Sequence, residues 1–177
     1  MSRIHLIVGP VGAGKTTFAR TLAAERRALR IDLDDWMATL FRPDRPEEGL
    51  VEWYVNRVDR CLAQIWRMAV EAVGNRIEVV LEVGLIRRAE RAAFYDRVEA
   101  AHIPLSVYLL DAPRDLRRQR VHQRNIEQGP TFSMVVPPAI FEFASDRWEP
   151  PDEAERLSRA MRVVAADNDA PELSPSA

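Results

Sequence analysis

The segment Gly9-Pro10-Val11-Gly12-Ala13-Gly14-Lys15-Thr16 restricts what this chain can fold into more than any other feature. It fits the pattern GxxxxGK[ST] at every fixed position, after an apolar run and at the start of a helical pattern. Backbone N–H groups at a helix amino terminus hold phosphate oxygens, and glycines let the backbone curl around an anion. The alternative is a glycine-rich turn between a strand and a helix. Lys15 argues against it, because it is the only lysine among 25 basic residues and arginine cannot replace a compact ammonium there.

The segment therefore predicts a phosphate-binding loop for a nucleoside triphosphate, with ATP and Mg²⁺ as cofactors. The ammonium of Lys15 supplies a mobile positive charge for the β and γ phosphates, and the Thr16 hydroxyl is the expected Mg²⁺ ligand. The expected nucleotide-binding residues of the loop are Gly9, Gly12, Ala13, Gly14, Lys15, Thr16 and Thr17.

Short apolar runs alternate with segments of helical spacing along the rest of the chain. The candidate strands cover residues 3–8, 29–33, 77–83, 105–110 and 161–165, and the candidate helices cover residues 16–28, 35–41, 50–73, 87–101 and 113–128. This alternation predicts an α/β fold in which helices cover both faces of a parallel sheet. The length of 177 residues favours a single domain, here residues 1–166. Residues 42–49 and 129–151 are expected to lack regular structure, and the Asp-, Pro- and Ser-rich tail 167–177 is expected to be unstructured.

Composition excludes several classes of protein. A single cysteine, Cys61, excludes an intramolecular disulfide and a cysteine-based zinc site, and favours a reducing compartment, the cytoplasm. The apolar run near the amino terminus is too short for a signal peptide or a membrane span, so no membrane partner is expected. A net charge of −2 does not favour a nucleic-acid partner.

The other motifs decide which class of nucleotide-binding enzyme this is. A GTPase needs a guanine-reading [NT]KxD, which a chain without a second lysine cannot contain. A remodelling ATPase carries a strand that ends in adjacent Asp-Glu, whereas this chain has Leu81-Glu82-Val83. A small kinase remains, which transfers the γ-phosphoryl group of ATP to a hydroxyl group.

Such a transfer needs a carboxylate that accepts the proton of the attacking hydroxyl. Asp34 is the candidate, and its alternative role is to cap a helix that begins near Asp35. Asp32 is expected on the same strand face as Asp34 and is the reserve base, acting through Mg²⁺ and water. Glu82, at the end of its strand, holds a magnesium water or the acceptor, or pairs with a nearby arginine. The expected metal site is Thr16, Asp32 and Glu82.

These segments resemble the compact P-loop kinases of the AAA_33-like group, which include polynucleotide 5′-kinase domains, zeta-type toxins, chloramphenicol phosphotransferase and gluconate kinase. The resembling segments, beside the phosphate loop, are DLDDW at 32–36, VVLE at 79–82, LLDAP at 109–113 followed by Arg117, Arg120, Arg124 and Asn125, and FEFASDRWEPPDEAE at 141–155. The resemblance implies five parallel strands in the order 2-3-1-4-5 and a lid from about residue 111 to 148. It also implies that Arg120 stacks on adenine and Arg124 contacts the phosphates. The group usually has Asp where this chain has Glu82.

For two regions of the sequence, a structural role is an alternative to the functional one. Arg120 and Arg124 lie four residues apart and share a helix face, which also fits a solvated charged helix. Residues 36–60 line the acceptor pocket in kinases of this shape, but aromatic residues at helical spacing there also fit a core. The residues available in that region are Trp36, Trp53, Tyr54 and Arg57.

Two rival functions remain beside a small-molecule kinase. A 5′-hydroxyl polynucleotide kinase would fit the resemblance, although the acidic balance of charge opposes it. A module that binds ATP with little turnover would keep the phosphate loop and make no use of Asp34.

Overall fold

The computed structural model describes residues 2–129 and 132–165. Within them, five parallel strands form one sheet in the order β2-β3-β1-β4-β5, which confirms the expected fold class and strand order. The strands are β1 (Ile4–Val8), β2 (Leu29–Asp32), β3 (Val79–Glu82), β4 (Leu105–Leu110) and β5 (Arg162–Val164). The tail 167–177, expected to be unstructured, lies outside the described residues.

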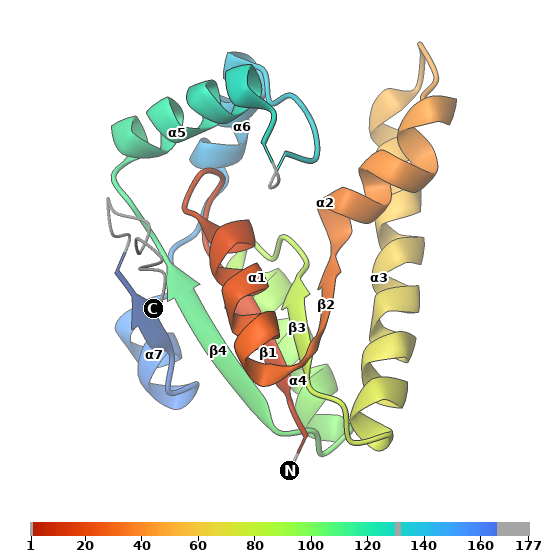
Figure 1. Cartoon of the computed structure of the whole chain (residues 1–177), viewed down its shortest axis with the longest axis vertical. Helices are drawn as coiled ribbons and strands as arrows, with labels where there is room; N and C mark the ends of the chain where they lie inside the picture. Colours follow the sequence, from red (N-terminus) through yellow and green to blue (C-terminus); the bar gives the residue numbers. More distant parts are fainter. Residues whose placement is uncertain (1, 130–131, 166–177) are drawn as a thin grey trace, which may run out of the picture.

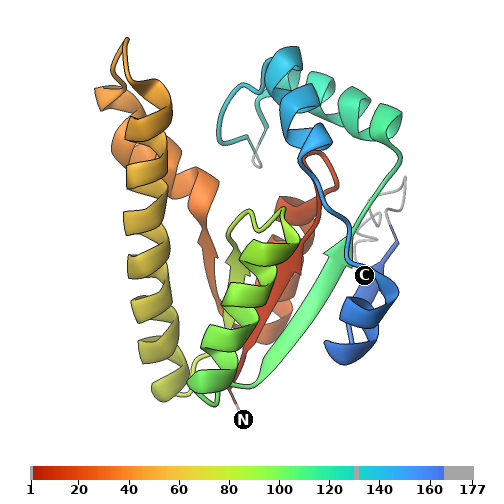
Figure 2. The ribbon, with the colours of Figure 1, turned by 180° about the vertical axis from the view of Figure 1, so that it is seen from behind.

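Helices cover both faces of this sheet, as Figures 1 and 2 show from opposite sides. Helix α1 (Lys15–Arg26) lies on one face, whereas α3 (Leu50–Gly74) and α4 (Arg88–Ala100) lie on the other. The alternation of side chains along β1 explains this arrangement, because Leu6 and Val8 pack with α3 and α4 while Ile7 packs with α1. Both faces of β1 are therefore buried, which keeps the sheet at the centre of the molecule.

The chain turns into a helix directly at the end of β2, earlier than expected. Asp32 caps this helix, because its Oδ1 accepts hydrogen bonds from the backbone N–H groups of Asp34 (3.0 Å) and Asp35 (3.4 Å). The capping role considered for Asp34 therefore belongs to Asp32, and the expectation that both share a strand face is wrong. The elements that follow are α2 (Leu33–Trp36), the π-helical turn η1 (Met37–Phe41) and the 3₁₀ turn η2 (Arg42–Asp44).

Two helices beyond β4 form a separate layer above the sheet (Figure 1). They are α5 (Arg114–Glu127) and α6 (Pro138–Asp146), which share the ion pairs Arg114–Glu142 and Arg118–Glu142. The expectation that residues 129–151 contain no regular element is wrong for α6. Prolines fit the first turn of a helix, where the backbone N–H needs no partner, so Pro137 and Pro138 begin α6 rather than prevent it.

A buried arginine fastens the segment after α6 to α4. Arg91 is 0% exposed and donates two hydrogen bonds to the carboxylate of Glu155, at 2.7 and 2.8 Å, and one to the Glu149 carbonyl oxygen at 2.9 Å. The backbone N–H of Glu149 donates to the Ile86 carbonyl oxygen at 3.0 Å. This Arg91 clasp explains the acidic segment at 149–155 and leads the chain into α7 (Glu153–Ser158) and β5.

No helix in the described part of the chain has both the length and the apolar character that crossing a membrane requires.

We expect Arg91→Ala to lower the free energy of unfolding by about 3–5 kcal/mol, because it leaves the Glu155 carboxylate without its buried partner. Urea unfolding followed by circular dichroism measures the change. Arg88→Ala is the matched control on the same helix, since Arg88 pairs with Asp152 at the exposed surface, and it should leave the transition nearly unchanged. Equal effects of the two substitutions would contradict this account of the Arg91 clasp.

Candidate functional site

The phosphate-loop segment connects the end of β1 to the start of α1. Gly9 lies so close to β4 that a Cβ there would stand 2.2 Å from the Leu110 carbonyl oxygen, so no larger residue fits. Ala13 is buried, whereas Thr17 is exposed in the first turn of α1. The ammonium of Lys15 donates to the Pro10 carbonyl oxygen at 2.9 Å and thus lies over the loop. The loop and the amino terminus of α1 form the arrangement that holds anions through backbone N–H groups.

The carboxyl ends of β2 and β3 bring two buried carboxylates beside this loop. Asp32 and Glu82 occupy paired positions on the two neighbouring strands and are 4% and 7% exposed. The Thr16 hydroxyl donates to Oε1 of Glu82 at 2.8 Å. The expected metal-site residues Thr16, Asp32 and Glu82 are therefore brought together, at the edge of the sheet where α1 begins.

Arg30 neutralises part of this negative charge, and the sequence interpretation missed it. Its Nη1 lies 2.9 Å from Oδ2 of Asp32 and 3.9 Å from Oε2 of Glu82. The sequence suggested that Glu82 pairs with a nearby arginine. That arginine is Arg30, and it bonds mainly to Asp32. Alternation along a strand would have indicated the pair, because Arg30 and Asp32 are two residues apart and share a face of β2.

Glu82 is the carboxylate most affected by its surroundings. Burial raises its pKa to about 7, and the charge of Asp32 adds to this rise, while Lys15 and the Thr16 hydroxyl oppose it. Among the described residues, its Oε2 is buried without a hydrogen-bond partner. A buried carboxylate oxygen without a donor favours a cation or a water bound to a cation at this position.

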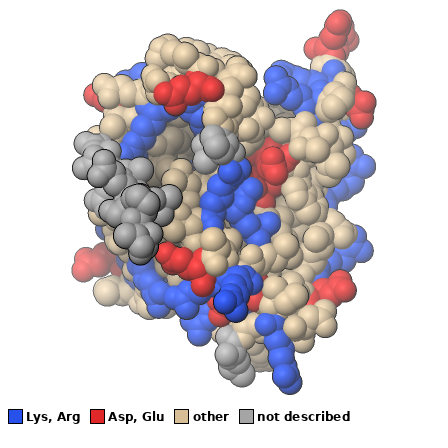
Figure 3. All heavy atoms as spheres, viewed as in Figure 1, with Lys and Arg blue, Asp and Glu red and all other residues tan. Residues whose placement is uncertain are grey.

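Asp34 lies at the start of α2, next to these groups. Its side chain is exposed to solvent, yet desolvation raises its pKa, and Asp32 raises it further. Lys15 and Arg124 oppose this rise through their positive charges. In Figure 3, basic and acidic side chains meet between α1 and β2.

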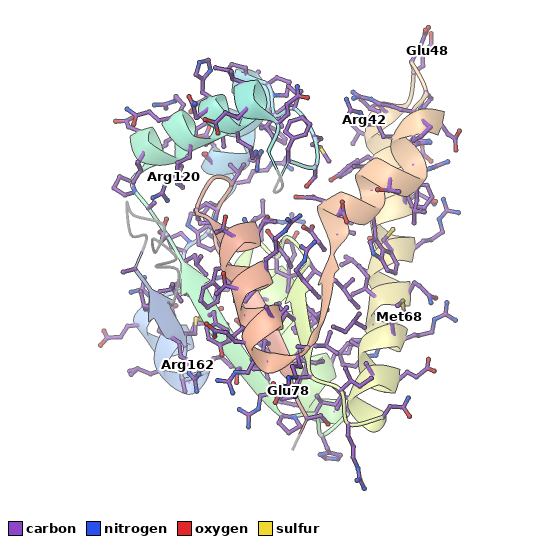
Figure 4. The ribbon with its side chains drawn as sticks, viewed as in Figure 1. Arg42, Glu48, Met68, Glu78, Arg120 and Arg162 are labelled. Carbon is purple, nitrogen blue, oxygen red and sulfur yellow. The ribbon has the colours of Figure 1, made fainter. Side chains whose placement is uncertain are left out.

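The two α5 arginines expected at the site differ in their surroundings. Arg124 is half-buried, and desolvation lowers its pKa, while the charges of Asp34 and Glu82 oppose that shift. Its Nε is also buried and, among the described residues, has no hydrogen-bond partner. Arg120 is half-buried on α5, at the same end of the molecule as Arg42 and opposite Glu78 (Figure 4). The structure therefore brings Arg124 to the carboxylates and leaves Arg120 further along the helix.

The residues considered for an acceptor pocket lie in different surroundings. Burial raises the pKa of the Tyr54 hydroxyl, and the charge of Asp34 adds to the effect, so this residue lies within the electrostatic reach of Asp34. The guanidinium of Arg57 lies 4.2 Å from the centre of the Trp53 ring and donates to the Trp53 carbonyl oxygen. Trp36 packs against the core, as the alternative interpretation expected.

Comparisons with known proteins agree with this geometry. Residues 4–151 match the family model AAA_33, described as AAA domain. Kti12 of Chaetomium thermophilum, in complex with ADP-AlF3, has a TM-score of 0.61 and 18% identity, over 94% of this chain and 90% of that one. A sugar kinase from Janibacter sp. HTCC2649 has a TM-score of 0.61 and 16% identity, over 94% and 86% of the two chains. A gluconokinase from Sinorhizobium meliloti 1021 has a TM-score of 0.56 and 17% identity, over 95% and 84%.

No curated protein matches the sequence. At these identities the solved structures establish the fold alone, which is the P-loop NTPase fold.

We expect the raised pKa of Glu82 to make the ligand-free protein less stable as the pH rises. The folded-state pKa of about 7 lies above the ordinary value of 4.5, so this stabilising contribution is complete below pH 4.5 and is lost as the pH passes 7. Titration of Glu82 should lower the free energy of unfolding of the wild-type protein by about 2–3 kcal/mol between pH 5 and pH 8, and Glu82→Gln should lack this decrease. Urea titrations at both pH values measure this difference.

The control for that experiment is Glu48→Gln, which changes an exposed glutamate in the loop before α3. It should keep the pH dependence of the wild-type protein. Parallel pH profiles for the wild type and Glu82→Gln would show that Glu82 titrates near its ordinary pKa.

Proposed function

The chain belongs to the AAA domain family AAA_33, and on this premise we propose that it is an ATP- and Mg²⁺-dependent phosphotransferase. It moves the γ-phosphoryl group of ATP to a hydroxyl group of a small-molecule or nucleotide-like acceptor. The observation that carries this proposal is the convergence of Asp34 with Lys15 and Arg124, a carboxylate facing two cations beside a phosphate loop. Phosphoryl transfer requires mainly positioning and charge neutralisation, which such a group of residues supplies.

The nucleotide is held by the loop and the first turn of α1. The N–H groups of the loop bind the phosphate oxygens, and Lys15 moves from the Pro10 carbonyl oxygen to the β and γ phosphates. The other loop residues in contact with ATP are Gly9, Gly12, Ala13, Gly14, Thr16 and Thr17.

Thr16, Asp32 and Glu82 suit a magnesium ion. Among the described residues there is no cluster of three or more His, Cys, Asp or Glu that could hold a metal alone. Mg²⁺ does not need one, because it keeps several waters and takes further oxygens from phosphates. The Thr16 hydroxyl and the unpartnered Oε2 of Glu82 offer protein oxygens for this purpose, directly or through water. When bound, the ion would neutralise negative charge on the transferred group.

Asp34 accepts the proton of the attacking hydroxyl. Its raised pKa makes it a stronger base than an ordinary aspartate, and the positive charges of Lys15 and Arg124 oppose this rise. Asp32 is a poorer base, since its oxygens already accept from Arg30 and from the amino terminus of α2. Tyr54, whose pKa the charge of Asp34 helps to raise, orients the acceptor.

Residues 111–148, with α5 and α6, act as the lid of a single domain formed by residues 1–166. Arg124 stabilises charge on the γ-phosphoryl group from above, and Arg120, one turn earlier, stacks on the adenine ring. Closure of these helices over the nucleotide keeps water from the reaction and limits hydrolysis.

We expect Asp34→Asn to lower the rate of phosphoryl transfer by about 10²–10⁴, the usual contribution of a general base, while the affinity for ATP is kept. Lys15→Ala should abolish both. Incubation with γ-labelled ATP and a panel of metabolites, antibiotics and 5′-hydroxyl oligonucleotides identifies the acceptor that gains label. Isothermal titration calorimetry with Mg-ATP measures binding.

Asp35→Asn is the matched control, because it removes the neighbouring exposed carboxylate of α2 and should leave both quantities unchanged. Unchanged function in Asp34→Asn together with loss in Lys15→Ala would favour a nucleotide-binding module that turns over little ATP. Label found only on the oligonucleotides, with a steep salt dependence of RNA binding, would favour a polynucleotide kinase.

A further inference from the structure

Arg117 of α5 is a buried arginine whose hydrogen-bond acceptors, within the described residues, are all uncharged. It is 5% exposed and donates from Nε to the Ala112 carbonyl oxygen (3.0 Å) and from Nη1 to the Val11 carbonyl oxygen (3.0 Å) and to Oγ of Ser145 (3.1 Å). Burial lowers its pKa, as expected of a guanidinium without a bonded carboxylate. Burying a charged group without an oppositely charged bonding partner raises the free energy of the folded state, so we expect this arginine to have a specific role.

The contact with Val11 determines how the tip of the phosphate loop is oriented. In a trans peptide the carbonyl of one residue and the N–H of the next point in opposite directions, and the structure contains no cis peptide among its described residues. The Val11 carbonyl points outward to Arg117, so the N–H of Gly12 points toward the inside of the loop. N–H groups on that side are the ones that receive phosphate oxygens.

Gly12 brings the loop into direct contact with the backbone of α5. Its φ is +79°, and a Cβ would stand 2.7 Å from the Arg117 carbonyl oxygen and 3.0 Å from Cγ2 of Val121. Helix α5 therefore forms the outer wall of the loop, and Arg117 bonds to the loop from the middle of this contact.

The pairing of α5 with α6 does not depend on Arg117 alone. Glu142 of α6 pairs with Arg114 and Arg118 at the surface. The side-chain amide of Asn125 also donates to the Val136 carbonyl oxygen at 2.8 Å and accepts from its N–H at 3.1 Å. Because these contacts already hold α5 against α6, we assign a different role to the hydrogen bond from Arg117 to the Val11 carbonyl oxygen.

We propose that Arg117 is a positioning residue for nucleotide binding, which holds the Val11–Gly12 peptide so that the Gly12 N–H faces the phosphates. It acts through the loop and does not touch the nucleotide. The same guanidinium also donates to Ser145 of α6, beside the ion pairs that hold α5 and α6 together. The inference rests on the proposed function only in that the loop binds a nucleotide.

The experiment compares Arg117→Met with the wild type by calorimetry, using Mg-ADP and adenosine as probes. Methionine keeps an extended buried side chain and removes the donors. We expect the affinity for Mg-ADP to fall about ten- to hundredfold, the equivalent of one lost charge-assisted hydrogen bond, and the affinity for adenosine to stay the same. A general loss of structure would instead weaken both probes.

Arg118→Met is the matched control, since Arg118 is the neighbouring residue of α5 and pairs with Glu142 at the surface. It should bind Mg-ADP as the wild type does. Sub-denaturing guanidinium ion should restore part of the Mg-ADP affinity of Arg117→Ala and should not change that of Arg118→Met.

The outcomes separate this inference from the proposed function. A wild-type protein that binds no Mg-ADP would overturn both. Wild-type affinity for Mg-ADP in Arg117→Met would overturn the role of Arg117 and leave the phosphotransferase proposal intact. If Arg117→Met does not fold, Arg117→Lys keeps a buried cation but replaces the two bonding nitrogens Nε and Nη1 with a single nitrogen, so we expect weaker binding of Mg-ADP, and wild-type affinity in that variant would also overturn the role.

Discussion

The parallel pairing of β1 with its neighbours is the constraint on which the candidate site depends. Because all strands of the described sheet run in the same direction, the loops that follow β1, β2 and β3 emerge at one edge. The register sets Asp32 beside Glu82, and the loop after β1 brings Thr16 within hydrogen-bond distance of Glu82. Residues up to 66 positions apart in sequence thus meet without any long side chain reaching across the fold.

Buried like charges give this edge its chemical character. Burial and the charge of Asp32 raise the pKa values of Asp34 and Glu82, and the nearby cation Lys15 opposes both shifts, while Arg124 opposes that of Asp34. Arg30 pairs with Asp32 itself. A carboxylate with a pKa near neutrality binds a proton readily or, in its place, a metal ion or a bound water. Among the described residues, Oε2 of Glu82 is buried without a hydrogen-bond partner, and this is typical of sites that are completed by a ligand.

The sequence predicted the strands, the main helices and the identity of the residues at the sheet edge, because hydrophobic periodicity and the glycine-rich motif are local signals. It missed α6, since prolines that usually break helices begin one there. It considered the helix cap as an alternative role of Asp34, whereas Asp32 forms the cap, because a shift of two residues at a helix start leaves almost no trace in composition. The roles of Arg91 and Arg117 depend on contacts over long sequence separations, with Glu155 and Val11 respectively, and no periodicity reveals such contacts.

The scarcity of lysine gives the molecule a built-in chemical marker. Lys15 carries the one side-chain primary amine of the whole sequence, and every other strongly basic side chain is a guanidinium. Acylating reagents that modify amines at neutral pH leave guanidinium groups intact, since these remain protonated. Among side chains, a reagent of this kind is therefore directed to the phosphate loop by composition, and the yield of its side-chain adduct reports how accessible that single nitrogen is.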